Sequence, residues 1–411
     1  MPVPIQQDTY PRLTPVDLSH FWDSREDRYL AWSALDPWFK THGYTLYPQT
    51  SPAALRPEPS AVYDLSNDAV EYPYAFAHEK TPFGRAFYPA LAVFPAVNKH
   101  HRDVVIKIVS SDSPELVIFK HLVSEPQRSD PLNLTVPVLD ILKYDDNHSF
   151  VVMPRWSTAS SLRDNGFDTL RTVFEFTKSL LKVLSFLHKN LIAYRDFKLT
   201  NILINCYHQT EGFYDFRPFF SSRQAKFVLC DFDLSIMFPP DTPPAARVCP
   251  ASESDWGSPW YHPPDTANGE ALYDPFAYDV ACLGGLLCGI IGYLTPLAPP
   301  LAPFLDRMIT PDIPSRYTAA EALEAFTVLS GSYSSEHLDQ PIPQPPYRFT
   351  NVSWQTQDRW AGLPKAFVEK HTRVRPPVRP KRKITFYNGS SCWLDWDVPS
   401  DDEGSDDDNE Q

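Results

Sequence analysis

The chain has 411 residues, of which 43% are hydrophobic and 14% aromatic, and its formal net charge is −14. Such a chain can bury a sizeable core, and its excess of acids excludes a basic nucleic-acid footprint over the whole surface, so no DNA or RNA partner is expected. The six cysteines lack the paired short spacings of a zinc site. They are typical of reduced thiols in an intracellular protein, cytoplasmic or nuclear.

Residues 1–70 are rich in proline and aromatic residues. The first twelve residues lack the basic-then-apolar pattern of a signal peptide. Aromatic pairs such as Trp38-Phe39 recur with a helix-like rhythm. We therefore expect an extension that packs on a larger domain.

Three apolar runs follow at 72–76, 86–94 and 104–109, and they predict an antiparallel meander of strands. The third run carries Lys107 as a lone charge. Taken singly, such a lysine most often reaches solvent at a sheet edge.

A helix with proline in its first turn is predicted for 113–122. Glu115 in that helix is our candidate ion-pair partner for Lys107, and Glu125 is a rival. Two further strands are predicted at 137–142 and 150–153, before a helix at 169–188.

The stretch 191–204 sets a carboxylate, an ammonium group and an amide between apolar flanks, at Asp196, Lys198 and Asn201. This spacing suits phosphoryl transfer, in which a carboxylate orients the attacking hydroxyl, an ammonium group offsets phosphate charge and an amide helps to hold a metal ion. A second apolar strand ends at Asp231, where a carboxylate is suited to bind magnesium.

These stretches resemble the eukaryotic protein kinases, whose catalytic loop reads His-Arg-Asp-x-x-x-x-Asn and whose metal motif reads Asp-Phe-Gly. Here the two motifs read Tyr194-Arg195-Asp196, with Asn201, and Asp231-Phe232-Asp233. The resemblance implies an α+β, two-lobed fold with a small β-rich lobe over 71–156 and a larger helical lobe over 157–330.

The resemblance also implies ATP and Mg²⁺ as cofactors and a protein as substrate. Asp196, Lys198 and Asn201 would be catalytic, with Asp231 and Asn201 holding magnesium. Residues 154–156 would connect the lobes and meet adenine through backbone groups. The residues implied for ATP binding are Gly84, Lys107, Glu115, Met153 and Arg155, and those implied to brace the catalytic loop are Arg195 and Asp279.

Three positions depart from the family pattern. Only Gly84 remains of the glycine-rich loop expected at 81–86, so we expect weakened contacts with nucleotide phosphates. Tyr194 replaces a histidine that braces the loop. Asp233 replaces a glycine, at a cost on the order of 1 kcal/mol if a left-handed backbone is required there.

The segment 257–265 resembles the motif that ends the family's activation segment, and its terminal acid, Asp265, is expected to pair with Arg316. The resemblance places an activating phosphate on Ser254, against Arg195. The alternative is an unmodified serine, with Glu253 and Asp255 already supplying negative charge.

The hydroxyl of Ser258 is expected near the catalytic Asp and Lys, as in serine/threonine kinases. Lys198, two positions after Asp196, favours the same specificity.

The uncharged run 280–305 breaks at Thr295-Pro296, which favours a buried core helix over a membrane span. For the aromatic insertion 206–226 we have no functional interpretation. Residues 331–411 are proline-rich, then basic, then acidic, and predict a largely disordered tail whose basic run is compatible with nuclear targeting.

An active protein kinase is the preferred function, because the charged set is complete. The main alternative is a pseudokinase scaffold that binds partners without efficient phosphoryl transfer. A small-molecule phosphotransferase is disfavoured by the segment 257–265 and by Arg316. The substrate and the oligomeric state stay open.

Overall fold

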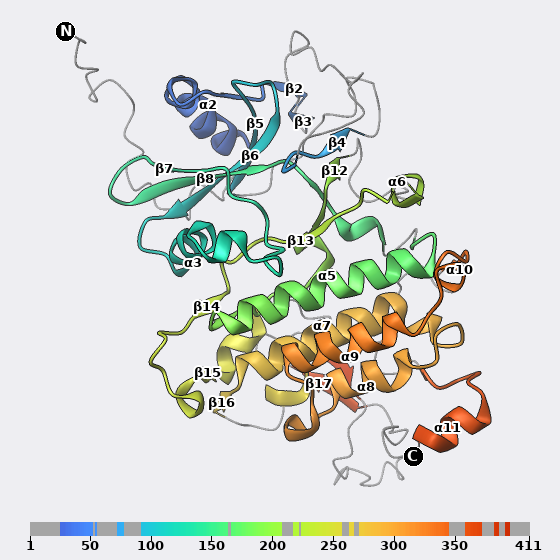
Figure 1. Ribbon diagram of the computed structural model, residues 1–411. Helices are drawn as coiled ribbons and strands as arrows, with labels where there is room; N and C mark the ends of the chain where they lie inside the picture. The colour runs from blue at the N-terminus through green and yellow to red at the C-terminus, as the bar shows by residue number, and fades with distance from the viewer. Residues whose placement is uncertain are drawn as a thin grey trace, which may run out of the picture.

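The computed structural model describes residues 25–51, 54–55, 72–77, 92–162, 166–207, 217–221, 223–256, 263–266, 271–344, 358–371, 382–385 and 391–394. A small lobe consists mainly of strands and helix α2 (Arg25–Thr41), and long helices form a larger lobe below it (Figure 1). The predicted two-lobed α+β fold is therefore confirmed.

The small lobe contains a five-stranded sheet in which every neighbouring pair is antiparallel. Its strands, in spatial order, are β1 (Tyr44–Leu46), β5 (Val93–Asn98), β6 (Asp103–Ser110), β8 (His148–Pro154) and β7 (Asp140–Lys143). The strands predicted at 104–109, 137–142 and 150–153 correspond to β6, β7 and β8.

The first strand of the predicted meander is wrong. Residues 72–74 form a turn and a bend, and the short strand β4 (Phe76–Ala77) pairs in parallel with β12 (Cys206–Tyr207) instead of joining the large sheet. Its place beside β5 is taken by β1, with Thr45 opposite Val97. Proline at 73 cannot donate to a ladder, whereas β1 is held by the helix before it, since Asp36 accepts from Leu46 N at 3.0 Å.

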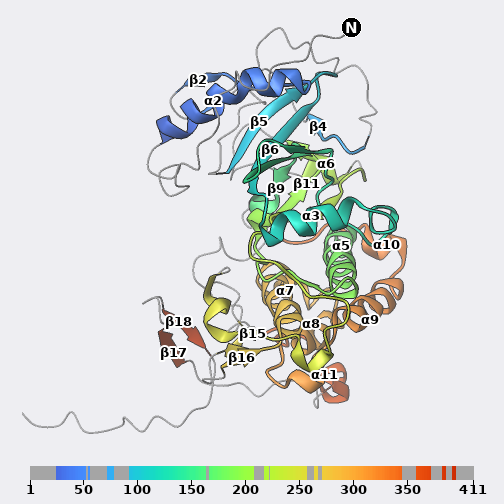
Figure 2. The same ribbon diagram turned by 90° about the vertical axis from the view of Figure 1, so that its left-hand side faces the viewer.

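Helix α2 covers the outer face of this sheet (Figure 2). Trp32, Leu35 and Phe39 recur at helical spacing and are buried. The Trp32 ring stacks on Phe94 at 5.2 Å between centroids, and Phe39 meets the edge of Phe150 at 4.8 Å. The aromatic residues of α2, Trp32, Trp38 and Phe39, thus belong to the core of the small lobe.

The opposite face of the sheet points toward helix α3 (Pro114–Val123) and the large lobe. Because strand residues alternate between faces, Val104 and Ile106 pack with α2 while Lys107 points the other way, into the space beside α3. Ser113 caps α3 by accepting from Leu116 N, and proline occupies its first turn. The cap fixes the start of α3 and therefore the position of Glu115 in its first turn.

The large lobe is a stack of helices around α5 and α7. The helices are α5 (Leu170–Lys189), α6 (Arg217–Ser221), α7 (Pro275–Ile291), α8 (Leu301–Ile309), α9 (Ala319–Gly331), α10 (Ser335–Leu338) and α11 (Lys365–His371). Helix α5 shows the predicted 169–188 periodicity, with Thr169 as its N-cap.

Helix α7 is the one described helix, together with the turn up to Leu294, that has the length and composition to cross a membrane. Its apolar 18-residue window is 83% buried inside the protein. A Cβ on Gly284 would lie 2.7 Å from Ile309 Cγ2, so this glycine allows α7 and α8 to approach closely. The run is a core helix, as expected.

Short strands hold the loops of the large lobe in place. They are β9 (Ser157–Thr158), β11 (Ile202–Ile204) and β13 (Phe227–Leu229) in one sheet, β10 (Ile192–Ala193) with β14 (Ile236–Met237), and β15 (Cys249–Pro250) with β16 (Leu272–Tyr273). Two further pairs are β2 (Gln49–Ser51) with β3 (Ala54–Leu55), and β17 (Arg382–Thr385) with β18 (Ser391–Leu394).

Part of the predicted tail is packed on the large lobe. Arg359 forms a buried ion pair with Asp306 of α8, and the Trp360 indole donates to the same carboxylate at 2.6 Å. Leu363 completes a small apolar cluster with Ala302. The composition of 331–411 could not predict this contact, because the residues that Arg359, Trp360 and Leu363 meet lie in α8.

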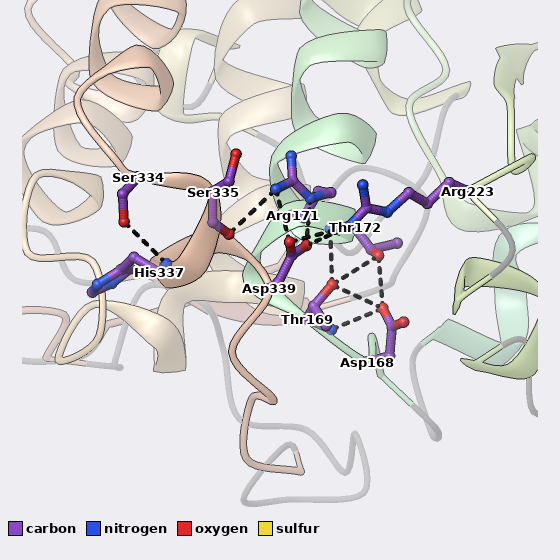
Figure 3. A network of polar contacts seen from close by, with 9 residues as sticks. All are labelled: Asp168, Thr169, Arg171, Thr172, Arg223, Ser334, Ser335, His337 and Asp339. Atoms are coloured by element: carbon purple, nitrogen blue, oxygen red, sulfur yellow. Dashed lines mark hydrogen bonds and ion pairs between the residues drawn. The ribbon is translucent and has the colours of Figure 1, made fainter.

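A surface network ties the start of α5 to α10 and to the end of the 206–226 insertion (Figure 3). Asp339 accepts from Arg171 at 2.6 Å and from Arg223 at 3.0 Å. The guanidinium of Arg171 lowers the pKa of Asp339 below its ordinary value. Such exposed pairs contribute little to stability, so the network mainly positions Arg223 beside α10.

Candidate active site

The catalytic loop is held from below by Asp279 of α7. This buried carboxylate accepts from Tyr194 N and from Arg195 N, each at 2.7 Å. Two backbone donors that face the core are thereby satisfied, and Arg195 is held at a φ of 69°. Asp279 therefore fixes the strained turn from which Asp196 projects.

Asp196 follows this turn and is only 1% exposed. We call the place where it meets Lys198, Asp231 and Lys107 the cleft. Its Oδ2 accepts from Lys198 Nζ at 2.6 Å and from Asn201 Nδ2 at 2.7 Å. Its Oδ1 is buried without a hydrogen-bond partner in the described structure. Burial raises the pKa of the Asp196 carboxyl, although Lys198 and Asn201 act in the opposite direction.

Lys107 joins the two lobes across the cleft. Its Nζ lies 2.6 Å from Glu115 Oε1 and 2.7 Å from Asp231 Oδ1, so of the two rival acids the structure brings Glu115, and not Glu125, to this lysine. Burial favours the neutral amine, but Asp231 and Glu115 outweigh it and raise the pKa of Lys107. The amine is therefore a fixed positive charge.

The metal motif is tied to α3 and to the catalytic loop. Phe232 donates its backbone N–H to Glu115 at 3.2 Å, and its ring packs on Phe119 and Tyr194. The Tyr194 hydroxyl donates to the Cys230 carbonyl at 2.6 Å. Tyrosine in place of the family's histidine thus connects the loop to the residue before Asp231.

The left-handed backbone considered for Asp233 is found at Asp231 instead. The left-handed residue of the motif is Asp231, with φ 65°, and Asp233 is not among the positive-φ residues. Aspartate is one of the side chains that tolerate this region best. The replacement of glycine at 233 therefore costs little in the backbone and adds a carboxylate.

Three acids converge at the mouth of the cleft. One oxygen from each of Asp196, Asp231 and Asp233 lies within 4.8 Å of the other two. Carboxylate oxygens are the ligands that magnesium prefers, and the partnerless Oδ1 of Asp196 is an acceptor that lacks a donor or a cation. The donor set therefore fits a divalent cation. Sequence reasoning treated Asp233 only as a backbone change, although its spacing of two residues from Asp231 was visible.

Met153 and Arg155, the two connector residues implied for ATP binding, have defined places in the structure. Met153 lies in β8, opposite Val105, and is buried in the main hydrophobic core. The backbone N–H of Arg155 donates to Asp103 O at 3.2 Å, and its guanidinium lies 5.8 Å over the Tyr47 ring. The N–H of Arg155 is thus bound to strand β6, while its guanidinium packs on Tyr47, which follows β1.

Arg195 meets a carboxylate in the activation segment. Its guanidinium contacts Glu253 Oε2 and the Glu253 carbonyl, each at 3.1 Å. Ser254 is buried, and its hydroxyl donates to Ala251 O at 2.7 Å. A phosphate on Ser254 stays a prediction, and in this conformation Glu253 supplies the negative charge opposite Arg195.

The far end of the segment is anchored by a buried pair. Arg316 holds both oxygens of Asp265, at 2.6 Å and 2.7 Å. Gly84 and Ser258 lie outside the described residues.

Comparison with known proteins agrees with the resemblance carried by the motifs. Residues 92–298, about half of the chain, match the family model described as the protein kinase domain. The match begins at β5 and ends after α7, so it includes both halves of the cleft. A search of curated proteins found no match to this chain.

Proposed function

The chain belongs to the protein kinase domain family, and from this premise we propose that it transfers the terminal phosphoryl group of ATP to serine or threonine hydroxyls of a protein. The observation that carries the proposal is the convergence of Lys107, Asp196 and Asp231 in one cleft, from segments far apart in the chain. Phosphoryl transfer depends mostly on positioning and on charge stabilisation, which these groups supply.

Asp196 is proposed to accept a hydrogen bond from the substrate hydroxyl. Its Oδ2 is occupied by Lys198 and Asn201, whereas Oδ1 has no partner in the described structure and can receive the hydroxyl proton. Lys198 is 37% exposed at its side chain, so its ammonium group can leave Asp196 to meet the transferred phosphoryl group. Its position two residues after Asp196 favours serine or threonine as the acceptor.

Lys107 is proposed to orient the phosphates of ATP, with Glu115 fixing its amine. Asp231 and Asn201 would hold Mg²⁺, which when bound would neutralise phosphate charge. The Phe232 contacts to α3 support a cleft that is already assembled.

A pseudokinase scaffold is the second candidate. The observation in its favour is the sequence of residues 81–86, where only Gly84 remains of the family's glycine-rich loop. Fewer glycines hinder the close approach of backbone N–H groups to phosphate, which weakens nucleotide binding before it abolishes chemistry.

The test is phosphorylation of a general substrate, or of the protein itself, with labelled ATP and magnesium. We expect incorporation on serine or threonine, and a loss of about a hundredfold or more in Asp196→Ala and Asp231→Asn. Asp241→Asn, an exposed acid of the same segment, is the matched control. Equal incorporation in wild type and both variants would contradict the enzyme, and a rise in melting temperature with ATP would then identify a nucleotide-binding scaffold.

A further inference from the structure

We propose that Asp233, together with Asp196 and Asp231, forms a divalent-cation site that binds Mg²⁺ or Mn²⁺ before any nucleotide enters the cleft. The proposal concerns the cleft of the proposed function, but it requires no phosphoryl transfer. In the family pattern a glycine stands at position 233, so the third carboxylate is a departure from that pattern.

The first support is geometric. One oxygen from each acid lies within 4.8 Å of the others. Oxygens bound to one magnesium ion lie about 3.0 Å apart when adjacent and about 4.2 Å apart when opposite, because the metal–oxygen distance is about 2.1 Å. A pair at the 4.8 Å limit must therefore move closer by about 0.6 Å or more to share one ion. Asp233 is exposed and is the side chain that can make this movement.

The second support is the unpaired acceptor. Exposed acidic groups gather on many surfaces without binding metal, but Asp196 is 1% exposed and its Oδ1 has no hydrogen-bond partner in the described structure. A buried acceptor without a donor costs about 1–3 kcal/mol, more when it is charged, and a cation at this oxygen removes that cost. The other oxygen already accepts from Lys198 and Asn201, so Oδ1 is the Asp196 oxygen left for a cation.

The third support is the charge of the cleft. The cleft holds two ammonium groups, on Lys107 and Lys198, and four carboxylates, so two negative charges are unbalanced. The carboxylates are those of Glu115, Asp196, Asp231 and Asp233. One divalent cation carries the charge that balances them. Because all donors are carboxylate oxygens, hard cations such as magnesium and manganese are preferred over zinc or copper.

The site is also accessible from solvent. The side chain of Asp231 is 33% exposed and Asp233 is exposed, while Asp196 closes the inner end. A cation can therefore enter from solvent and shed water onto the carboxylates. It would then occupy Asp196 Oδ1, the atom proposed for the substrate hydroxyl, so excess cation should compete with substrate.

The experiment is titration of the nucleotide-free full chain with Mn²⁺, followed by electron paramagnetic resonance of the free ion, and with Mg²⁺ by calorimetry. We expect one Mn²⁺ per chain in the wild type. Asp233→Asn, which keeps the size of the side chain, should weaken binding about tenfold or more, since even residues behind metal ligands change affinity by that factor. Asp241→Asn, exposed and outside the cluster, should bind like the wild type.

Two results overturn the proposal: no saturable binding to the wild type at millimolar cation, or equal affinities of the wild type and Asp233→Asn. Because Asp233 is exposed, the variant should fold, and its melting temperature without metal checks this. Added Mn²⁺ should raise the melting temperature of the wild type more than that of the variant. Phosphorylation from ATP is measured separately, so failure of the cation site and failure of the kinase are distinguishable.

Discussion

The cleft and the large lobe both bury charged side chains, but they treat them differently. In the large lobe, Arg316 and Asp265 are each 1% exposed at the side chain, and the guanidinium also donates to the carbonyls of Thr310 and Ala277. Asp306 is likewise enclosed by two donor side chains, Arg359 and Trp360. In the cleft, Asp196 keeps an unpaired oxygen and acids outnumber bases.

The difference separates scaffold from site. A buried charge with all its partners inside the protein holds segments in register and has no capacity for a ligand. A buried charge with an unfilled position is unfavourable in the free protein and becomes favourable only when something binds. Activity and stability should therefore respond in opposite ways to substitutions in the two regions.

The largest effect is expected at Arg316. Arg316→Met leaves Asp265 buried and unpaired, so the free energy of unfolding should fall by about 3–5 kcal/mol, measured by urea denaturation. A second variant that also carries Asp265→Leu should recover part of this loss, because no unpaired charge is left. A loss below about 1 kcal/mol in Arg316→Met would show that this pair is not the anchor we describe.

The next effect concerns Arg195, which connects the two regions. Glu253→Gln removes the charge opposite this arginine, and a charge-assisted hydrogen bond of about 1.5–3 kcal/mol is weakened. We expect kcat/KM for phosphoryl transfer to fall about tenfold, because the segment 251–256 no longer holds the catalytic loop as tightly.

Ser254→Ala is the matched control, since its hydroxyl contacts Ala251 and Thr266 and not Arg195. Its kcat/KM should stay within about twofold of the wild type. If it falls as far as that of Glu253→Gln, and mass spectrometry finds phosphate on Ser254, our account of Glu253 fails.

Much of the fold and of the cleft followed from local patterns in the sequence. Strand β6, helix α3 and helix α5 have strong periodicity and caps, and the spacing of Asp196 to Asn201 lies within one loop. The sequence favoured Glu115 over Glu125 as the partner of Lys107 only slightly. Glu115 lies in the first turn of α3, so its direction depends on where the helix begins, and the N-cap Ser113 sets that start.

The failures all involve partners distant in sequence. Neither the place of Tyr44–Leu46 as the edge strand nor the contact of Tyr47 with Arg155 can be predicted from local pattern, because the paired residues are at least 50 positions apart in the chain. The carboxylate of Asp233 was not predicted as part of the site, because the family's glycine at this position suggests only a change in backbone conformation.

A smaller effect of opposite sign is expected at Asp196. Asp196→Asn removes a buried charge that lies near Asp231 and Asp233, so stability at neutral pH should rise by about 1 kcal/mol while activity is lost. Urea denaturation without metal or nucleotide measures it. The conservative variant Asp279→Asn should instead lose stability, because Asp279 accepts from two backbone groups and has no unfilled position. Equal losses in both variants would remove the distinction between site and scaffold.

The smallest effect is the pH dependence of that gain. Burial raises the pKa of Asp196 in the folded protein above its ordinary value of 3.8, so the folded state binds this proton more tightly than the unfolded state. The wild type therefore gains stability from this group as pH falls through the folded pKa, and loses it as pH rises. Asn cannot titrate, so the advantage of Asp196→Asn should shrink as the pH is lowered from neutral toward 4. Glu115, whose pKa burial also raises, is common to both proteins and largely cancels in the difference. An advantage that stays constant or grows on acidification would mean that Asp196 is not destabilised by its burial.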